Sequence, residues 1–242
     1  MRALGSLWAT LASVCGRYSL TNPADIPERF NLTGLHEAGI EPRFNAAPTQ
    51  ELPVIIGTPE GPALQLMRWG FEPFWMRNQV KRRPQINARA ETLLESPMFR
   101  DAAISHRCLI PADGFYEWTS PPGSRTSQPL HIRLRGGGLF AFAGIYAERR
   151  DGPATYAIVT TKPNELVASV HNRMPVILDP DDEASWLGNA CTDPLAVLGC
   201  LRRYPPQEME AYPVGPLVSS AWNEGPELIE PVSISQPRLW SM

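Results

Sequence analysis

Apolar residues gather along the chain in short runs that are separated by turn-forming residues. The runs are rich in β-branched and aromatic side chains and have roughly the length of strands, and they lie at 53–57, 64–71, 107–118, 129–135, 139–148, 155–161 and 174–178. Glycine and proline mark turns at 57–61, 121–123, 136–138 and 151–153. This pattern predicts a mainly antiparallel, barrel-like sheet of many short strands.

Segments with helical character are few and short. They lie at 24–30, 164–170, 181–187 and 194–203, and the second and third begin at residues of the N-cap type, Asn164 and Asp181. No internal repeat and no convincing boundary divides the chain. The patterns together predict an α+β fold: a single compact domain with a mainly antiparallel β core and short helices at its periphery.

Composition limits the partners that the protein can have. The net charge of −3 provides no overall basic field for nucleic acid, so contact with DNA would need a local patch of arginines. No segment reaches the roughly 18 apolar residues of a membrane span. Residues 2–14 only weakly resemble a secretory or lipoprotein signal, because they carry one arginine and their apolar run is short. We therefore expect a soluble, cytoplasmic protein.

The cysteines do not suggest a metal centre. The four, Cys15, Cys108, Cys191 and Cys200, show neither CxxC pairs nor the spacing of zinc ligands. We expect reduced thiols and no metal site, with one thiol available as a nucleophile.

Reactive side chains stand beside turn-forming or aromatic residues at four positions, Cys15, Asn87, Glu117 and His171. Cysteine and histidine are the usual pair of nucleophile and base, and a carboxylate can tune either. Each residue also has an ordinary structural interpretation, since a cysteine in an apolar run is commonly a small core residue. Spacing alone leaves both interpretations open.

Longer motifs favour the functional interpretation. The blocks CGRY (15–18), RFNAAPTQ (43–50), RWGFEPFW (68–75), INARAET (86–92), RCLIPADGFYEW (107–118), FAGIY (142–146) and TT-x2-N-x6-H-x-RMPVIL (160–178) resemble, in this order, those of the SRAP family (SOS-response-associated peptidase). Residues 221–231 resemble the C-terminal block of that family. One block would be a weak signal, whereas seven in order over most of the chain are specific. The resemblance implies the compact, mainly β SRAP fold and a role in DNA repair.

The resemblance also implies which residues act. The catalytic positions that it implies are Cys15, Asn87, Glu117 and His171. The DNA-binding positions that it implies are Arg17, Pro48, Trp75, Arg89 and Trp118. No cofactor is implied, and the expected partner of the monomer is single-stranded DNA that contains abasic sites.

The implied chemistry requires an N-terminal cysteine. An abasic site exposes an aldehyde, with which an α-amine condenses to an imine, and a neighbouring thiol then closes a thiazolidine ring. The α-amine, with a pKa of about 7.7–8.0, is already partly nucleophilic at neutral pH. Glu117 would accept a proton from the amine, Asn87 would orient it, and His171 would move protons during opening of the sugar ring. The same groups would cleave the bond before the cysteine, and Trp118 would stack on a flanking base.

One departure from the family pattern concerns the N terminus. The family has MCGR, whereas fourteen residues precede Cys15 here. Three explanations compete: translation starts at Val14 and not at Met1, or residues 1–14 are a propeptide removed by self-cleavage, or crosslinking has been lost. We favour the first explanation and divide the chain into an extension, 1–14, and an SRAP domain, 15–242. The alternatives are a non-covalent module for single-stranded or modified DNA, a thiol peptidase that acts on other proteins, and a lipoprotein.

Overall fold

The larger of the two sheets has seven strands, of which all but β4 (Gly61–Trp69) and β5 (Asn87–Arg89) are buried over most of their length. In a computed structural model, which describes residues 15–32, 39–76, 84–119, 127–188 and 193–233, the strands of this sheet are β3 (Glu51–Thr58), β4, β5, β6 (Arg107–Ala112), β9 (Phe140–Ala147), β10 (Thr155–Thr161) and β11 (Met174–Pro175). Because β10 pairs with β9 as well as with β4, the strands β3, β4, β10, β9 and β6 close into a small barrel. The ring is antiparallel except between β10 and β4. The predicted extension, 1–14, lies outside the described residues.

A second, five-stranded antiparallel sheet carries the start of the described chain. Its order is β12 (Met209–Pro213), β8 (Gln128–Leu134), β7 (Gly114–Thr119), β1 (Tyr18–Leu20) and β2 (Arg43–Ala46). The predicted strand 107–118 is wrong as a single strand, because the chain leaves the barrel at Asp113 and enters this sheet. The carboxylate of Asp113 accepts hydrogen bonds from Ser19 Oγ (2.6 Å) and Thr21 Oγ1 (2.7 Å), which hold the break in place.

Aromatic side chains fill the barrel. Tyr18, Trp69, Phe142 and Tyr156 are buried, with the ring centroids of Tyr18 and Trp69 5.3 Å apart. Every residue of β6 and β10 is buried, and for this reason these strands appear in the sequence as continuous apolar runs instead of alternating ones. Residues of both sheets belong to the same buried cluster, so the fold is one domain.

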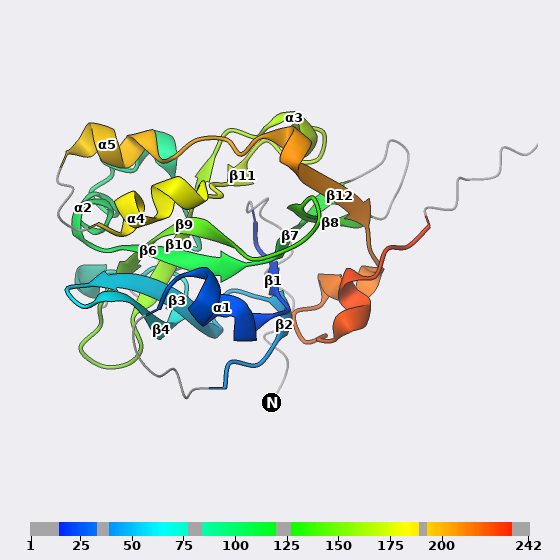
Figure 1. Ribbon diagram of the computed structural model, residues 1–242, viewed down its shortest axis with the longest axis horizontal. Coiled ribbons are helices and arrows are strands. Elements are labelled where there is room, and N and C mark those ends of the chain that lie inside the picture. The colour runs from blue at the N-terminus through cyan, green and yellow to red at the C-terminus, as the bar shows by residue number, and fades with distance from the viewer. Residues whose placement is uncertain (1–14, 33–38, 77–83, 120–126, 189–192, 234–242) are drawn as a thin grey trace, which may run out of the picture.

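Short helices surround the sheets (Figure 1). They are η1 (Pro23–Asp25), α1 (Ile26–Arg29), η2 (Phe74–Met76), η3 (Ala90–Thr92), α2 (Arg100–Ser105), α3 (Glu165–Ala168), α4 (Pro180–Leu187), α5 (Pro194–Gly199), η4 (Pro206–Glu208), η5 (Pro216–Ser219) and η6 (Pro226–Ile229). In Figure 1, α2, α4 and α5 lie together on one side of the molecule, and the C-terminal η5–η6 segment lies on the other, beside β1 and β2.

The helix predictions are confirmed in part. Asn164 caps α3, accepting a hydrogen bond of 3.0 Å from the backbone N–H of Val167. The cap predicted at Asp181 is wrong, because α4 begins at Pro180 and is capped by Asp179. The last predicted helix ends at Gly199, and α2 was not predicted. The predicted α+β class, with a mainly antiparallel β core and short peripheral helices, is confirmed.

Candidate functional site

Cys15 stands directly before β1, and its backbone nitrogen contacts Glu117 of β7. The antiparallel pairing of the two strands sets Tyr18 opposite Phe115, which brings the residues before β1 alongside the far end of β7. The Cys15 N–H donates a hydrogen bond of 2.8 Å to Oε1 of Glu117. Cys15 itself has φ 46°, in the left-handed region that residues other than glycine seldom adopt.

Burial changes the protonation of both groups. Glu117 is 4% exposed, and desolvation raises the pKa of its carboxyl from 4.5 to about 7, although the hydrogen bond from Cys15 opposes the shift. Burial also raises the pKa of the Cys15 thiol well above its usual value, and the nearby charge of Glu117 adds to this. At neutral pH the thiol is protonated, while the carboxyl is able both to give and to take a proton.

The strand β5 presents Asn87 and Arg89 on one face. Alternate residues of a strand share a face, and Ala88 between them is buried, whereas Asn87 is half-buried and Arg89 is exposed. In the parallel pairing with β10, Arg89 lies opposite Thr160. The exposed residue Arg89 therefore lies at the C-terminal end of β10.

His171 lies in the loop between α3 and β11. Its Nδ1 accepts a hydrogen bond of 3.1 Å from the backbone N–H of Arg173, so in the neutral ring the proton is on Nε2. Partial burial lowers the pKa of His171; the backbone hydrogen bond from Arg173 opposes this shift, and the charge of Arg173 adds to it. The ring is therefore neutral at pH 7 and offers Nε2–H as a donor.

The strand β10 brings the Asn87 and Arg89 pair of β5 to the same end as the His171 loop. Thr160 pairs with Arg89 on one side and with Pro175 of β11 on the other. Asn87 and Arg89 therefore flank the same end of β10 as the loop that carries His171. The Cys15–Glu117 pair comes from the smaller sheet.

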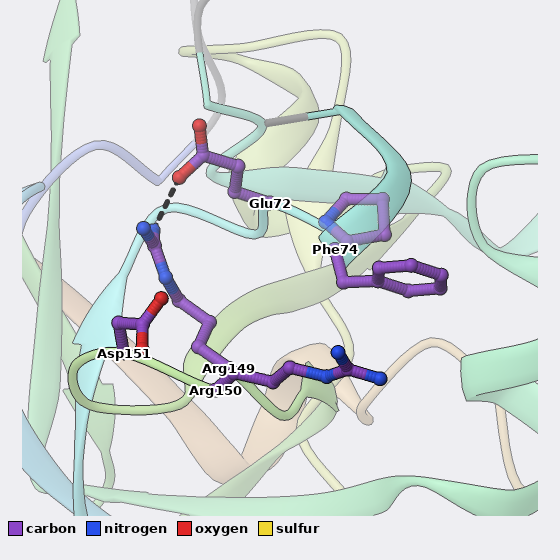
Figure 2. A pocket seen from close by; sticks show the side chains of 6 residues that line it. Glu72, Phe74, Arg149, Arg150 and Asp151 are labelled. Carbon is purple, nitrogen blue, oxygen red and sulfur yellow. Dashed lines mark hydrogen bonds and ion pairs between the residues drawn. The ribbon is translucent and has the colours of Figure 1, made fainter. Parts of the chain in front are cut away.

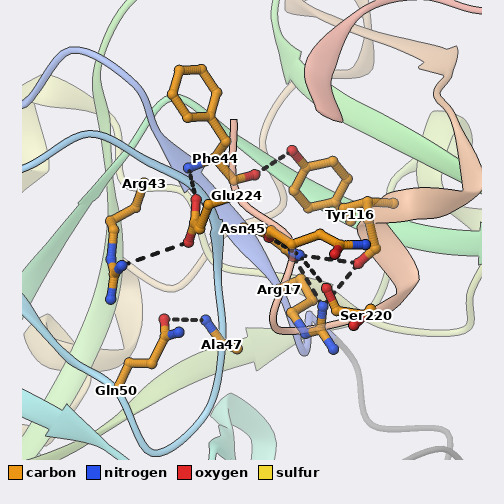
Figure 3. Close-up of polar contacts among 11 residues, drawn as sticks. Arg17, Arg43, Phe44, Asn45, Ala47, Gln50, Tyr116, Ser220 and Glu224 are labelled. Carbon is orange, nitrogen blue, oxygen red and sulfur yellow. Dashed lines mark hydrogen bonds and ion pairs between the residues drawn. The ribbon is translucent and has the colours of Figure 1, made fainter. Parts of the chain in front are cut away.

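Arg17 is anchored by the C-terminal segment (Figure 3). Its Nη1 donates to Oδ1 of Asn45 (3.0 Å) and to the carbonyl oxygen of Val218 (2.9 Å). Asn45 is buried, and its Nδ2 donates to the carbonyl oxygens of Val218, Ser220 and Asn223. Burial lowers the pKa of Arg17. Several of its donors are thus occupied within the protein, although arginine keeps its charge at neutral pH.

The remaining predicted DNA contacts lie on separate segments. Trp118 follows Glu117 on β7, is half-buried, and donates from Nε1 to Ser219 Oγ (3.1 Å). Trp75 in η2 is 46% exposed, and Pro48 is half-buried in the loop after β2. Trp118 therefore adjoins the Cys15–Glu117 pair, whereas Pro48 and Trp75 come from other parts of the chain.

A surface hollow of about 120 Å³ is lined by none of the predicted site residues, although Phe74 in its wall precedes Trp75 in η2. It is lined by Glu72, Pro73, Phe74, Arg149, Arg150 and Asp151. Figure 2 shows Glu72 and Arg149 joined by an ion pair across it. The hollow contains no nucleophile, so we place the candidate active site at Cys15.

Sequence reasoning missed three residues that support the site. Asn45 holds Arg17, and Glu91 forms an ion pair of 2.6 Å with Arg173, next to His171. All three missed residues, Asn45, Glu91 and Arg173, stand inside the motif blocks that carry the resemblance. Their positions in those blocks were the available signal.

The described parts of the chain contain no group of three or more His, Cys, Asp or Glu residues that could hold a metal ion. In the same parts of the chain, no helix has the length and apolar character needed to cross a membrane.

Comparisons with known proteins give a consistent result. Residues 14–221 match the sequence model of the family described as SOS response associated peptidase (SRAP). The abasic site processing protein YoqW of Bacillus subtilis is 44% identical over 224 residues, which cover 90% of this chain and 99% of that protein. The abasic site processing protein HMCES of Gallus gallus is 28% identical over 84% of this chain and 70% of its own. A crystal structure of a protein from Bacteroides thetaiotaomicron has the same fold, with a TM-score of 0.77, 23% identity, and coverage of 90% of this chain and 100% of its own.

Proposed function

The chain belongs to the SOS response associated peptidase (SRAP) family, and from this premise we propose that it captures abasic sites in single-stranded DNA by a covalent crosslink through Cys15. The name abasic site processing protein, which its relatives carry, supports this substrate. The crosslink needs Cys15 as the N-terminal residue, because only then does one residue offer both a free amine and a thiol.

The observation that carries the proposal is the contact between the Cys15 nitrogen and Glu117. The distance of 2.8 Å is short enough for direct proton transfer. A carboxyl with a pKa of about 7 is suited to this work at neutral pH, since it is present in both forms. Burial of an ionisable carboxyl lowers stability. A neutral side chain could accept the Cys15 N–H without this cost, so a carboxyl at this position favours a role in proton transfer.

Exposure of the amine is the first proposed step where residues 1–14 are present. The Cys15 thiol attacks the carbonyl carbon of Val14 and the C–N bond breaks. Neutral Glu117 gives its proton to the leaving nitrogen and takes up the proton that the thiol releases. Water then hydrolyses the resulting thioester and releases the extension. The left-handed conformation of Cys15, which costs about 1–2 kcal/mol in a non-glycine residue, favours breaking this bond.

Capture of the aldehyde follows. Ionised Glu117 takes a proton from the α-ammonium, and the free amine adds to the aldehyde carbon of the opened sugar. Loss of water, with a proton supplied by a neutral acid, gives the imine. The amine acts before the thiol in this scheme, because the raised pKa of the thiol keeps it protonated and weakly nucleophilic. The thiol then adds to the imine carbon, its proton passes to the nitrogen, and the ring closes.

His171 and Asn87 assist in the proposed mechanism. His171 takes part in the proton transfers that open the sugar ring, and its neutral ring, with the proton on Nε2, donates a hydrogen bond to the sugar oxygen. Asn87 lies on the same face of β5 as Arg89 and orients the reacting nitrogen through its amide.

Binding of DNA is assigned to residues around these groups. Arg89 is exposed and pairs with a phosphate, while Arg17 supports the backbone of the site. Trp118 stacks on a flanking base, a contact of roughly 1–3 kcal/mol that does not depend on sequence, and Pro48 and Trp75 extend the surface. The protein acts as a cytoplasmic monomer, associated with the nucleoid when bound to damaged DNA.

A crosslinking assay tests the proposal. Protein that starts at Cys15 should form a heat-stable adduct with labelled single-stranded DNA that contains one abasic site, and none with intact DNA. Cys15→Ser should leave only a reversible imine, which borohydride traps. If protein with a residue retained before Cys15, verified by intact mass, crosslinks at the normal rate, the aminothiol mechanism is wrong.

The same preparations distinguish the alternatives. Binding of abasic DNA without an adduct would favour a non-covalent module, and Cys15-dependent cleavage of casein would favour a general thiol peptidase. The burial of Cys15 argues against the peptidase, because a foreign polypeptide would have to reach an enclosed sulfur.

A further inference from the structure

Arg173 joins three segments beside His171. Its Nη1 forms an ion pair of 2.6 Å with Oε1 of Glu91 in η3, and its Nη2 donates to the carbonyl oxygen of Thr160 (2.6 Å) at the end of β10. Its backbone N–H donates to Nδ1 of His171. One residue therefore connects the fixed edge of the barrel to the imidazole ring.

We propose that Glu91 is a positioning residue for His171, which it orients through the Arg173 side chain and backbone. The inference rests on the proposed function in one respect, since it takes His171 to be a proton-transfer group. Glu91 does not touch the reacting atoms and is not a catalytic residue.

The argument begins with geometry. Arg173 is two residues from His171, so the position of its backbone N–H depends on where its side chain is held. The guanidinium is anchored at two points, Glu91 and Thr160, and its side chain is only 14% exposed. Loss of the Glu91 carboxylate removes one of these anchors. The loop that carries His171 can then move, and the hydrogen bond from the Arg173 N–H to Nδ1 of His171 moves with it.

Charge acts in the same place. The Arg173 cation disfavours the imidazolium form of His171, and Glu91 partly neutralises this cation. Arg173 lowers the pKa of Glu91, to which Lys162 also contributes, so the carboxylate is ionised throughout the neutral range. Replacing Glu91 by glutamine would leave the cation uncompensated and would lower the pKa of His171 further.

The alternating positions of the segment explain why Glu91 is suited to this role. Asn87, Arg89 and Glu91 follow one another at every second residue, and the first two stand on the exposed side of β5. Glu91 continues from them into η3, where it meets Arg173. One short segment therefore carries a predicted orienting amide, an exposed guanidinium and the anchor of the opposite loop.

The first test is structural and does not depend on DNA. In protein labelled with ¹⁵N-histidine, Glu91→Gln should lower the pKa of His171 and increase exchange between its tautomers, with His171→Gln used to assign the signals. Glu95→Gln is the matched control, because it removes the same charge from an exposed residue four positions later that makes no ion pair with any residue that the structure describes. His171 signals that respond equally little to both variants would overturn the proposal.

The second test separates positioning from DNA binding. At saturating abasic DNA, Glu91→Gln should capture about tenfold more slowly than the Glu95→Gln control, a smaller loss than removal of a proton-transfer group causes. Affinity for DNA that contains a tetrahydrofuran analogue, which has no aldehyde, should stay within about twofold. A change in affinity with an unchanged saturated rate would assign Glu91 to DNA binding and refute the positioning role. If the wild-type protein forms no adduct, the proposed function fails, while the NMR experiment still decides the role of Glu91.

Discussion

Replacement of Glu117 by glutamine should stabilise the protein while it impairs the reaction. The glutamine keeps an oxygen that can accept the Cys15 N–H and removes only the ionisable group. In the unfolded chain this carboxyl releases its proton near pH 4.5, whereas the folded protein retains the proton up to about pH 7. Ionisation of Glu117 therefore favours unfolding. The free energy of unfolding is highest below pH 4.5, where the carboxyl is neutral in both states, and it decreases as the pH rises through 7.

The size of the expected change in the free energy of unfolding follows from the difference between the pKa values of Glu117 in the folded and unfolded states. Each pKa unit corresponds to about 1.4 kcal/mol, so the shift of the carboxyl represents roughly 3 kcal/mol at pH 8. The pKa of about 7 already includes the opposing hydrogen bond from Cys15, so nothing further is subtracted for its loss. We expect Glu117→Gln to raise the free energy of unfolding by about 3 kcal/mol at pH 8 and by about 0 at pH 4.5.

Denaturant unfolding at both pH values, followed by tryptophan fluorescence, measures this difference. The comparison belongs in a Cys15→Ala background, in which residues 1–14 stay attached and the Cys15 nitrogen remains an amide. Glu95→Gln, at an exposed position, should change stability equally at the two pH values. If Glu117→Gln also shifts stability equally at both, the carboxyl is not held neutral by burial, and the assignment of Glu117 as a proton donor loses its basis.

Three further substitutions test the surroundings of the site. Arg89→Ala should weaken binding of single-stranded DNA and reduce the salt slope by about one in fluorescence anisotropy; an unchanged slope would remove Arg89 from the DNA face. Asn45→Ala should lower the free energy of unfolding by about 2–4 kcal/mol, because it leaves Arg17 and buried carbonyls without their partner, and a wild-type melting temperature would contradict this. Gly114→Ala should cost about 1–3 kcal/mol in the same assay, since its Cβ would lie 2.2 Å from His131 Nε2; a neutral effect would mean that the ring moves aside freely.

The parts of the fold that the sequence predicted are those whose cause is local. The strands β6 and β10 are buried at every position, so their apolar composition identified them. Asn164 caps α3 with its side chain, which accepts a hydrogen bond from the backbone N–H of Val167, only three residues later. The start of α4 was also encoded locally but was misread, because Pro180 favours the first helical position and makes Asp179 the cap.

Features that depend on distant partners were not predicted. Asn45 was not singled out, yet its Nδ2 donates to the carbonyl oxygen of Val218, 173 positions away. Asp113 divides an apparently continuous strand, because its carboxylate accepts hydrogen bonds from two residues that are distant in sequence. These are Ser19 in β1 and Thr21, which directly follows β1. The candidate catalytic positions were named by motif resemblance, and composition alone would not have distinguished Glu117 from an outward residue of an alternating strand.

A carboxyl whose pKa lies near 7 has one more consequence, for the order of the two proposed reactions. Cleavage before Cys15 needs neutral Glu117, which falls from about 90% of the protein at pH 6 to about 10% at pH 8, so cleavage should slow about tenfold over this range. Once the bond is broken, an α-ammonium replaces the amide beside the carboxyl and lowers its pKa, and Glu117 then acts as the base that capture requires. Capture should accordingly be faster at pH 8 than at pH 6, the opposite of cleavage. Intact mass, measured over time for the full chain and for its adduct with abasic DNA, follows both rates in one sample. Parallel pH dependences would show that a single protonation state of Glu117 serves both reactions, and the proposed change of role would be wrong.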